Sequence, residues 1–476
     1  GFFPGVSVGW NIMEEDFWKE SKVSDIVSNL KPRLSYGVNG NVNGIGNYEV
    51  YGEYAQVDAK TYGGATALYN KKLLNTNLRW EQSQTFEVGL DIGFLQNRFS
   101  FILDFYSRRT KDLLTKQALP GYTGFSDIVT NMGTLRNSGF EAEVKANIIN
   151  KGGFTWDMTA NITSVANKII SLPYNNVENN RVGGYEVAAG KVDADGKFPT
   201  KWIAGRQEGG KLGELVGYRQ QHVFKDWDDV KQHANLRVDE VANLYGPGLA
   251  DQINPATGKT YKESSGWQPI EPGDACWEDI NGDNIINGYD RSVMGNIFPN
   301  VTGGFSTTFG YKGLSLYARF DYALGHTLYN DLKARSLGQY QGQFNIITDV
   351  KDMWSEANPN SDLTKFYYAD QLAKKNITRS NNASTAADNN SSRYYEKGDY
   401  LALREITLSY QLPKSLISKA HLTEASVYVT GQNLFYITGY DGVSPEPAVS
   451  TTYGRGIDNG RYPTPRTFLF GLSLTF

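Results

Sequence analysis

Hydrophobic and polar residues alternate with a period of two along much of this chain, most clearly in its last ten residues. There, Phe468, Phe470, Leu472, Leu474 and Phe476 fall on one side, and mostly small or polar residues fall on the other. Successive side chains of a β-strand point to opposite faces, so the pattern predicts a strand with one apolar face. About ten residues is also the length that a tilted strand needs to cross a bilayer. An edge strand of a soluble β-sandwich fits these ten residues equally well.

The same alternation recurs along the chain, and one segment carries charge on its polar side. Between Phe140 and Ile148, the intervening positions are Glu141, Glu143, Lys145 and Asn147, which a lipid-facing surface would not accept. The length and number of such segments, with this charged inner face, favour a transmembrane antiparallel β-barrel over a sandwich. We expect about eleven spanning strands, near residues 2–10, 30–38, 86–94, 99–106, 140–148, 156–163, 302–311, 314–324, 400–412, 425–436 and 467–476.

Short and long connections alternate between these strands. Outer-membrane barrels have short periplasmic turns and long extracellular loops, and the short turns here follow Phe94, Ile149 and Tyr311. Residues 12–29 are expected to form a further periplasmic turn with helical character, and residues 213–220 an extension inside the longest loop. If the C-terminus is periplasmic, the extracellular loops are predicted at 41–82, 110–136, 167–300, 326–399 and 438–465.

Composition supports a barrel and excludes several other classes. Aromatic residues make up 13% of the chain, with 30 Tyr, 23 Phe and 50 Gly, which suits aromatic girdles around a polar interior. No run of eighteen apolar residues occurs, so a transmembrane helix is not predicted. The net charge of −4 gives no electrostatic reason to expect a nucleic-acid partner. The single cysteine, Cys276, excludes an intrachain disulfide.

One twelve-residue segment has the spacing of a calcium-binding loop. It reads Asp279-Ile-Asn-Gly-Asp-Asn-Ile-Ile-Asn-Gly-Tyr-Asp290, with oxygen ligands at positions 1, 3, 5, 9 and 12 and a backbone carbonyl at position 7. Asn284 replaces the usual glycine but tolerates the left-handed conformation needed there, and Asp290 replaces the usual glutamate. The alternative is an Asx-rich turn that binds nothing. The expected ligands of a structural Ca²⁺ are Asp279, Asn281, Asp283, Ile285, Asn287 and Asp290.

Catalytic chemistry is not indicated. The acidic residues Glu141 and Glu143 are better explained as a lumen lining than as an acid–base pair, and no catalytic motif has a supporting context. Some loop aromatic residues could stack on a ligand, although packing explains them better: Tyr394, Tyr395, Trp202 and Trp227. The histidines are scattered without metal-ligand spacing, so each is expected on the surface or in the lumen: His222, His233, His326 and His421.

Ten segments spread over the whole chain also resemble a known family. They are Phe2-Phe-Pro-Gly-Val-Ser-Val-Gly-Trp10, Leu30-Lys-Pro-Arg-Leu-Ser-Tyr-Gly37, Asn77-Leu-Arg-Trp-Glu81, Val88-Gly-Leu-Asp91, Thr110-Lys-Asp-Leu-Leu114, Asn131-Met-Gly-Thr-Leu-Arg-Asn-Ser-Gly-Phe-Glu141, Asp279-Ile-Asn-Gly-Asp283, Leu403-Arg-Glu-Ile-Thr-Leu-Ser-Tyr-Gln-Leu-Pro413, Gly431-Gln-Asn-Leu434 and Tyr462-Pro-Thr-Pro-Arg466. In this order, they resemble the C-terminal half of SusC-like (SusC/RagA) TonB-dependent outer-membrane transporters. No segment is diagnostic alone, but their order over the whole chain is specific.

The resemblance implies a complete architecture. Residues 1–476 would form half of a 22-stranded barrel in a bacterial outer membrane, surrounded by lipid. A missing N-terminal part would supply the plug, about eleven further strands and the contact with TonB. A SusD-like surface lipoprotein would cover the barrel, and the imported nutrient would be an oligosaccharide or an oligopeptide. The alternative is an outer-membrane structural or adhesion barrel without active transport; neither reading is an enzyme.

Overall fold

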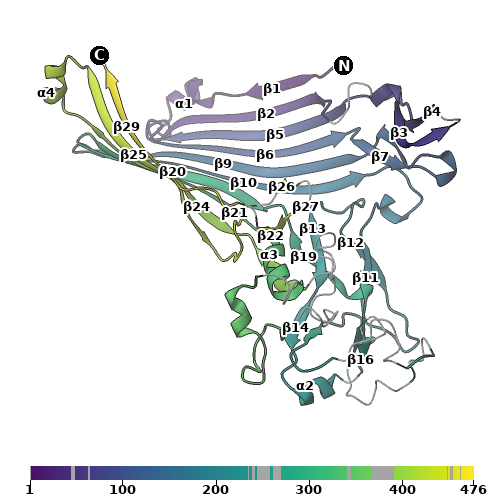
Figure 1. The fold of residues 1–476 in the computed structure, drawn as a ribbon. Coiled ribbons are helices and arrows are strands. Elements are labelled where there is room, and N and C mark those ends of the chain that lie inside the picture. The colour runs from purple at the N-terminus through teal and green to yellow at the C-terminus, as the bar shows by residue number, and fades with distance from the viewer. Residues whose placement is uncertain are drawn as a thin grey trace.

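Eleven strands of the computed structural model form one antiparallel sheet, whose order in space follows the order in sequence (Figure 1). We call this sheet the wall. The predicted strands are thereby confirmed. The wall does not close within the described residues, because β1 and β29 form its two edges. Its members are β1 (Gly5–Gly9), β2 (Val27–Asn41), β5 (Glu81–Phe94), β6 (Phe99–Lys111), β9 (Thr134–Lys151), β10 (Phe154–Ser171), β20 (Val301–Tyr311), β21 (Leu314–Leu324), β24 (Tyr400–Gln411), β25 (Glu424–Thr438) and β29 (Thr467–Thr475).

The structure describes most of the chain, with gaps mainly in the long connections. The predicted connections 41–82, 167–300, 326–399 and 438–465 each lie partly outside the described residues. These residues are 2–43, 49–62, 65–233, 235–238, 242–243, 253, 258–260, 270–339, 345–366, 391–446, 449–450, 454–460 and 462–476.

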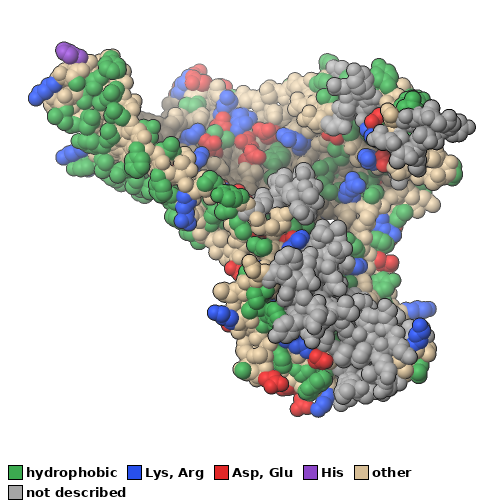
Figure 2. Space-filling view, in the orientation of Figure 1, with side chains coloured by type: hydrophobic (Ala, Val, Ile, Leu, Met, Phe, Trp, Pro, Cys, Tyr) green, Lys and Arg blue, Asp and Glu red, His purple; other side chains and the backbone are tan. Residues whose placement is uncertain are grey.

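The pairing register gives the wall two chemically different faces. Leu103 pairs with Leu90 on one side and Ala142 on the other, whereas its neighbour Ile102 pairs with Asp91 and Glu143. The alternation seen within single strands therefore continues across the sheet. The polar face lines the hollow of the curved wall, where acidic and basic side chains gather in Figure 2. Apolar side chains cover the opposite face and remain open to their surroundings.

The short turns lie at one end of the wall, as the sequence predicts. The turn between β5 and β6 is built on left-handed residues at Leu95, Gln96 and Asn97, whose φ values are 51°, 60° and 61°. The turns that follow β9 and β20 contain glycines with positive φ, namely Gly152, Gly153 and Gly313. The helical character expected for residues 12–29 is confirmed by a 3₁₀ turn at Ile12–Glu14 and by α1 (Asp16–Lys19). Helix α4 (Lys414–Ile417) precedes β25. The assignment of this end to the periplasm stays a prediction.

Two of the long connections form hairpins beside the wall. They comprise β3 (Glu53–Tyr62) with β4 (Ala65–Lys72), and β7 (Leu114–Ala118) with β8 (Asp127–Asn131). The side chain of Asn131 accepts the backbone N–H of Arg79 at 2.7 Å, and Asn75 donates to the carbonyl of Val129 at 2.8 Å. These bonds attach the second hairpin to the chain that follows the first.

The connection between β10 and β20, residues 172–300, is a folded unit that we call the insertion. In Figure 1 it extends away from the wall. The prediction that residues 213–220 belong to this connection is confirmed, because β13 pairs with β19 and not with the wall. Its elements are β11 (Tyr185–Ala188), β12 (Thr200–Ile203), β13 (Glu214–Tyr218), β14 (Gln220–Val223), α2 (Trp227–Gln232), β15 (Arg237–Val238), β16 (Ala242–Asn243), β17 (Ala275–Trp277), β18 (Ile285–Ile286) and β19 (Arg291–Asn296).

The insertion has its own hydrophobic cores. The larger core surrounds Trp277, Phe224 and Ile286, which are 1%, 0% and 0% exposed. A smaller core contains Val187, Ile203, Ala204 and Val216. Burial of this kind stabilises a soluble domain by removing apolar surface from water.

A further core forms in the connection that precedes β24. It packs Tyr329, Ala334, Leu337 and Tyr394 together, and Tyr395 donates a 2.7 Å hydrogen bond to the carbonyl of Val216 in the insertion. Its elements are β22 (Thr327–Asn330), α3 (Asp331–Ala334) and β23 (Tyr395–Lys397), and β28 (Ile457–Asp458) pairs in parallel with β22. The small hairpin β26 (Val449–Ser450) with β27 (Gly454–Arg455) completes the last long connection. Among the helices of the described residues, none has the length and apolar character needed to cross a membrane.

Candidate functional site

The polar face of the wall holds a network of charges near its first edge. The guanidinium of Arg33 lies 2.9 Å from a carboxylate oxygen of Asp91, 2.8 Å from one of Asp104 and 3.6 Å from one of Glu87. The four residues lie on the neighbouring strands β2, β5 and β6, at positions whose side chains point to the polar face. The pairing register of these strands therefore brings the side chains together. Hydrogen bonds between charged groups are stronger than those between neutral groups, so this network helps to hold the four side chains in place.

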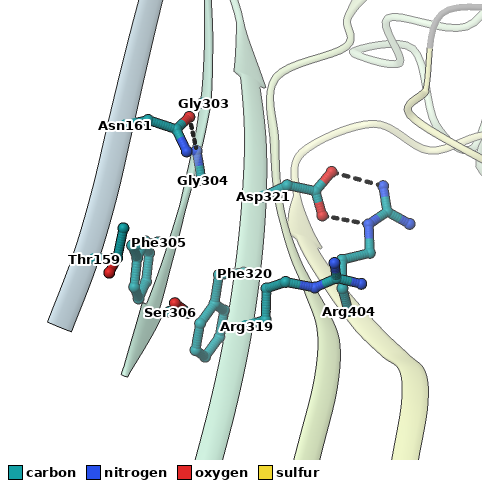
Figure 3. A pocket seen from close by; sticks show the side chains of 10 residues that line it. All are labelled: Thr159, Asn161, Gly303, Gly304, Phe305, Ser306, Arg319, Phe320, Asp321 and Arg404. Carbon is teal, nitrogen blue, oxygen red and sulfur yellow. Dashed lines mark hydrogen bonds and ion pairs between the residues drawn. The ribbon is translucent and has the colours of Figure 1, made fainter. Parts of the chain in front are cut away.

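A second polar cluster lies across β10, β20, β21 and β24, where the hollow contains a pocket of about 440 Å³. In Figure 3, Arg404 points toward Asp321, and Arg319 extends beside it. Phe305 and Phe320 pair with each other in the apolar phase of β20 and β21, and their rings stack 4.7 Å apart. The pocket is lined by Thr159, Asn161, Gly303, Gly304, Phe305, Ser306, Arg319, Phe320, Asp321 and Arg404.

Arg404 reaches this pocket because it is the extra residue of a β-bulge. Leu403 pairs with Phe320 and Glu405 pairs with Arg319, so the register shifts between them. The guanidinium of Arg404 binds both carboxylate oxygens of Asp321, one of them at 2.9 Å. Bulges commonly redirect a side chain in this way.

The same guanidinium also anchors the last long connection. It donates to the hydroxyl of Tyr436 at 3.1 Å and pairs with Glu446, to which Tyr436 donates at 3.0 Å. The cluster therefore combines hydrogen-bond donors and acceptors on a rigid frame. Such a surface can bind a polar solute, as pockets lined by a few fixed polar groups do.

In the predicted calcium loop, the aspartate side chains accept hydrogen bonds from backbone N–H groups of the loop itself. Asp279 accepts the N–H of Gly282 at 2.7 Å and that of Asn284 at 2.8 Å, and Asp283 accepts that of Ile285 at 2.7 Å. Asn284 has φ = 66°, so it does adopt the left-handed conformation expected from the sequence. Position 6 of the loop therefore has the conformation that the motif requires.

The fit of this loop to a cation depends on the free lone pairs of its oxygens. A carboxylate offers about four acceptor sites, so Asp279 and Asp283 keep acceptor capacity after these bonds. Asp290 is fully buried, and its two oxygens accept the N–H groups of Ile280 and Asn287 at 2.9 and 2.8 Å. Burial raises the pKa of Asp290 to about 6, and the charges of Asp279 and Asp283 act in the same direction.

The oxygen atoms of the predicted calcium ligands do not all converge on one position. Within the described residues, the three carboxylates of the loop are not a set whose oxygens all lie within 4.8 Å of one another. Asn281 is fully buried, and its amide donates to Asp283 at 2.9 Å. The side-chain oxygen of Asn287 accepts the N–H of Tyr289 at 2.8 Å. The polar groups of the loop therefore already have hydrogen-bond partners within the loop. A bound cation would have to draw the carboxylates closer together.

Two of the histidines come together in the structure, although their spacing in the sequence shows no metal-ligand pattern. His222 and His233 meet Cys276, and one ligand atom from each of these three side chains lies within 4.8 Å of the others. Sequence spacing could not reveal this set, because cross-strand pairing of β14 with β17 places His222 opposite Cys276. His326 is buried, against expectation, and its Nε2 lies 2.9 Å from the carbonyl oxygen of Pro445.

The aromatic residues considered as ligand contacts mostly pack against the protein itself. Tyr394 is only 3% exposed within its core, and the ring of Trp202 is covered by the guanidinium of Arg181 at 3.6 Å. Trp227 is 46% exposed at the start of α2. Packing is thereby confirmed for Tyr394 and Trp202.

Known proteins with similar sequences are β-barrel receptors, which agrees with a wall that has one polar and one apolar face. A family model described as TonB dependent receptor-like, beta-barrel matches residues 1–257. TonB-dependent receptor P3 of Formosa agariphila is 28% identical over 482 residues, which cover 100% of this chain and 42% of that protein. TonB-dependent receptor SusC of Bacteroides thetaiotaomicron is 29% identical over 490 residues, covering 100% of this chain and 40% of that protein. The chain thus spans less than half the length of these relatives.

Solved structures share the fold at lower identity. The RagAB peptide importer in its open-open state aligns with a TM-score of 0.69 and 22% identity, over 100% of this chain and 42% of that chain. The RagAB peptide transporter aligns with a TM-score of 0.67 and 22% identity, over 100% of this chain and 43% of that chain. At this identity, the likeness concerns the fold.

Proposed function

Because the chain belongs to the TonB-dependent receptor-like β-barrel family, we propose that it forms half of the barrel wall of a TonB-dependent nutrient importer. The main support is the separation of the eleven strands into an apolar face and a charged face. An apolar face suits the hydrocarbon of an outer membrane, and a polar face suits a hydrated lumen. Both edges of the wall, β1 and β29, pair with one strand each within the described residues.

In this proposal, the wall has a passive role. Its polar face surrounds the plug and the passing solute, and the long connections face the exterior. The remaining strands, the plug and the contact with TonB would come from a further part of the transporter. A SusD-like lipoprotein would cover the exterior end, and the cargo would be an oligosaccharide or an oligopeptide, because a pocket with arginine, aspartate, asparagine and hydroxyl side chains can serve either.

Uptake in the source bacterium tests this function. Strains with and without the gene would receive labelled oligosaccharides and, separately, labelled oligopeptides, with and without an uncoupler of the proton-motive force. We expect one class of nutrient to lose uptake both in the deletion strain and after uncoupling. Unchanged uptake of both classes would contradict active import and favour a structural or adhesion barrel. Purification of the intact transporter would separately test whether a SusD-like lipoprotein accompanies it.

We also propose a structural Ca²⁺ in the loop that runs from Asp279 to Asp290, with the predicted ligands Asp279, Asn281, Asp283, the Ile285 carbonyl, Asn287 and Asp290. The left-handed Asn284 and the remaining acceptor capacity of the carboxylates support it. Calcium content would be measured in the intact transporter and in Asp279→Ala and Asp283→Ala variants, with exposed Asp195→Ala as the control. Calcium should be lost only from the two loop variants. Equal content in all four proteins would contradict the site.

A further inference from the structure

Two histidines and the single cysteine of the chain meet at the margin of the larger core of the insertion. His222 lies on β14, His233 follows α2, and Cys276 lies on β17. The sulfur and one nitrogen of each imidazole all lie within 4.8 Å of one another. Imidazole nitrogen and thiolate sulfur are the donors that Zn²⁺ prefers, and three protein ligands with an open fourth position form a recurrent zinc geometry.

The orientation of both imidazoles is fixed by one residue, Asp229. Nε2 of His222 lies 3.3 Å from the Asp229 carboxylate, and Nδ1 of His233 lies 3.0 Å from the Asp229 backbone oxygen. These oxygens can only accept hydrogen bonds, so each nitrogen facing them must carry the proton. In the neutral imidazole, the other nitrogen of each ring then keeps its lone pair. Metal-binding histidines usually have such an arrangement, with the second N–H donated to a carboxylate or a carbonyl.

Asp229 is itself held in place by the backbone around it. Its carboxylate accepts the N–H of Lys225 at 3.0 Å, and Asp226 caps the helix by accepting the N–H groups of Asp228 and Asp229, both at 2.9 Å. Because these hydrogen bonds hold Asp229 in place, the protein itself sets the orientation of both imidazole rings. A metal would not need to create it.

Access from the histidine side also suits a metal. Cys276 is 1% exposed within the core, whereas the side chains of His222 and His233 are 35% and 32% exposed. An ion could therefore arrive from the histidine side, and a water molecule could fill the fourth position. Two nitrogen atoms and one sulfur atom in a tetrahedral zinc site are about 3.3–3.6 Å apart by the bond lengths, so the three side chains need only a small inward movement.

We propose that His222, His233 and Cys276 form a binding site for a divalent transition-metal ion, with Zn²⁺ as the expected ion. On binding, the thiol proton of Cys276 is released to solvent and a sulfur–metal bond forms. No electron is transferred. The ion would link β14, α2 and β17, which are distant in sequence, and would thereby stabilise the insertion. This site is separate from the proposed calcium loop, whose ligands are oxygen atoms.

Cobalt titration tests the site, because Co²⁺ replaces Zn²⁺ and its thiolate bond absorbs in the near ultraviolet. The intact transporter would be purified in detergent through a tag without histidine, stripped with a chelator and titrated with Co²⁺, and then with Zn²⁺ in competition. We expect one equivalent of Co²⁺ with a thiolate charge-transfer band that Zn²⁺ abolishes.

Three variants and one control distinguish a site from adventitious binding. Cys276→Ser should lose the charge-transfer band, while His222→Gln and His233→Gln should weaken binding at least about tenfold, the scale found when metal-site groups are altered. His421→Gln, at a turn of the wall, should bind as the unaltered protein does. If Cys276→Ser does not fold, His222→Gln decides the question, because this side chain is partly exposed and glutamine can still bond to Asp229. Absence of the band, or equal affinity in all variants, would overturn the proposal.

Discussion

The wall and the insertion use apolar residues in opposite ways. In the wall, large apolar side chains lie on an open face: Phe105 is 57% exposed and Phe470 is 82% exposed. In the insertion, residues such as Trp277 and Phe224 are almost completely buried. Apart from β1, the strands of the wall contain nine to eighteen residues and shift register at only a few positions, whereas the strands of the insertion contain two to six residues each.

This difference shows that the two regions depend on different surroundings. An open apolar face is unfavourable in water and favourable against lipid hydrocarbon, so the wall needs a membrane to be stable. The insertion buries its apolar groups against each other and can maintain its core in water. Mutations should therefore affect the two regions separately, and the sizes of their effects should differ.

The largest effect is expected from removing the central side chain of the insertion. Trp277→Ala leaves a large cavity and should destabilise the insertion by about 3–5 kcal/mol. Trp277→Phe should cost less, because it keeps most of the ring and removes an indole N–H that has no hydrogen-bond partner. Limited proteolysis of the insertion, measured beside the thermal unfolding of the barrel, would separate the regions. Simultaneous unfolding of both would contradict their independence.

The wall is tested by placing the same charge on its two faces. Leu103→Arg puts a guanidinium against lipid and should destabilise the barrel by about 2–4 kcal/mol. The matched variant Ile102→Arg places it beside Asp91 and Glu143 and should change stability by less than about 1 kcal/mol. Urea unfolding in lipid vesicles measures both. Equal losses would show that the faces have been assigned wrongly.

A smaller effect is expected from the charge network on the polar face. Arg33→Ala leaves Asp91, Asp104 and Glu87 close together without their shared cation. The groups are partly exposed, so solvent screening limits the loss to about 1–2 kcal/mol. The loss should decrease with added salt, and Arg33→Lys should recover part of it. A salt-independent loss would point to packing of the Arg33 side chain instead.

The smallest effect is expected at the start of α2. Asp226→Ala removes the side chain that accepts two backbone N–H groups, and loss of such a cap costs about 1 kcal/mol. Because Asp229 lies in the same turn, hydrogen exchange should accelerate there and not in the wall. Asp226→Asn is the control, since asparagine is also a good cap. Unchanged exchange in Asp226→Ala would mean that the cap has no local role.

The wall could be predicted from the sequence because its structural rule is local and repeated. Each strand is long enough to display the period of two, and each face has one chemical character over its whole length. Glu141, Glu143 and Lys145 were sufficient to distinguish a lumen from lipid within one strand. The bulge at Arg404 was not predicted. Strict alternation would place Leu403 and Glu405 on the same face of the strand, although one is apolar and the other is charged. The bulge between them places the two side chains on opposite faces.

The insertion could not be predicted in the same way, because its contacts join residues that are far apart in sequence. Its strands are too short for a period to be visible, and its core residues have no common spacing. His222, His233 and Cys276 meet only after β14 has paired with β17 and α2 has packed beside them. The calcium loop could be predicted from the sequence because its candidate ligands lie within twelve consecutive residues, and both the cation and its ligands stay a prediction.

Cysteine cross-linking in the complete transporter tests most directly whether this chain is half of a larger barrel wall. Val6→Cys or Val8→Cys on β1 would be combined with Phe470→Cys, Leu472→Cys or Leu474→Cys on β29, so that several registers are covered. The Val427→Cys and Leu472→Cys pair, which are cross-strand partners in β25 and β29, serves as the positive control. We predict efficient cross-linking of the control pair and none between β1 and β29, because each edge should pair with a strand outside this chain. Efficient cross-linking between β1 and β29 would contradict this, since the chain would then close a barrel by itself.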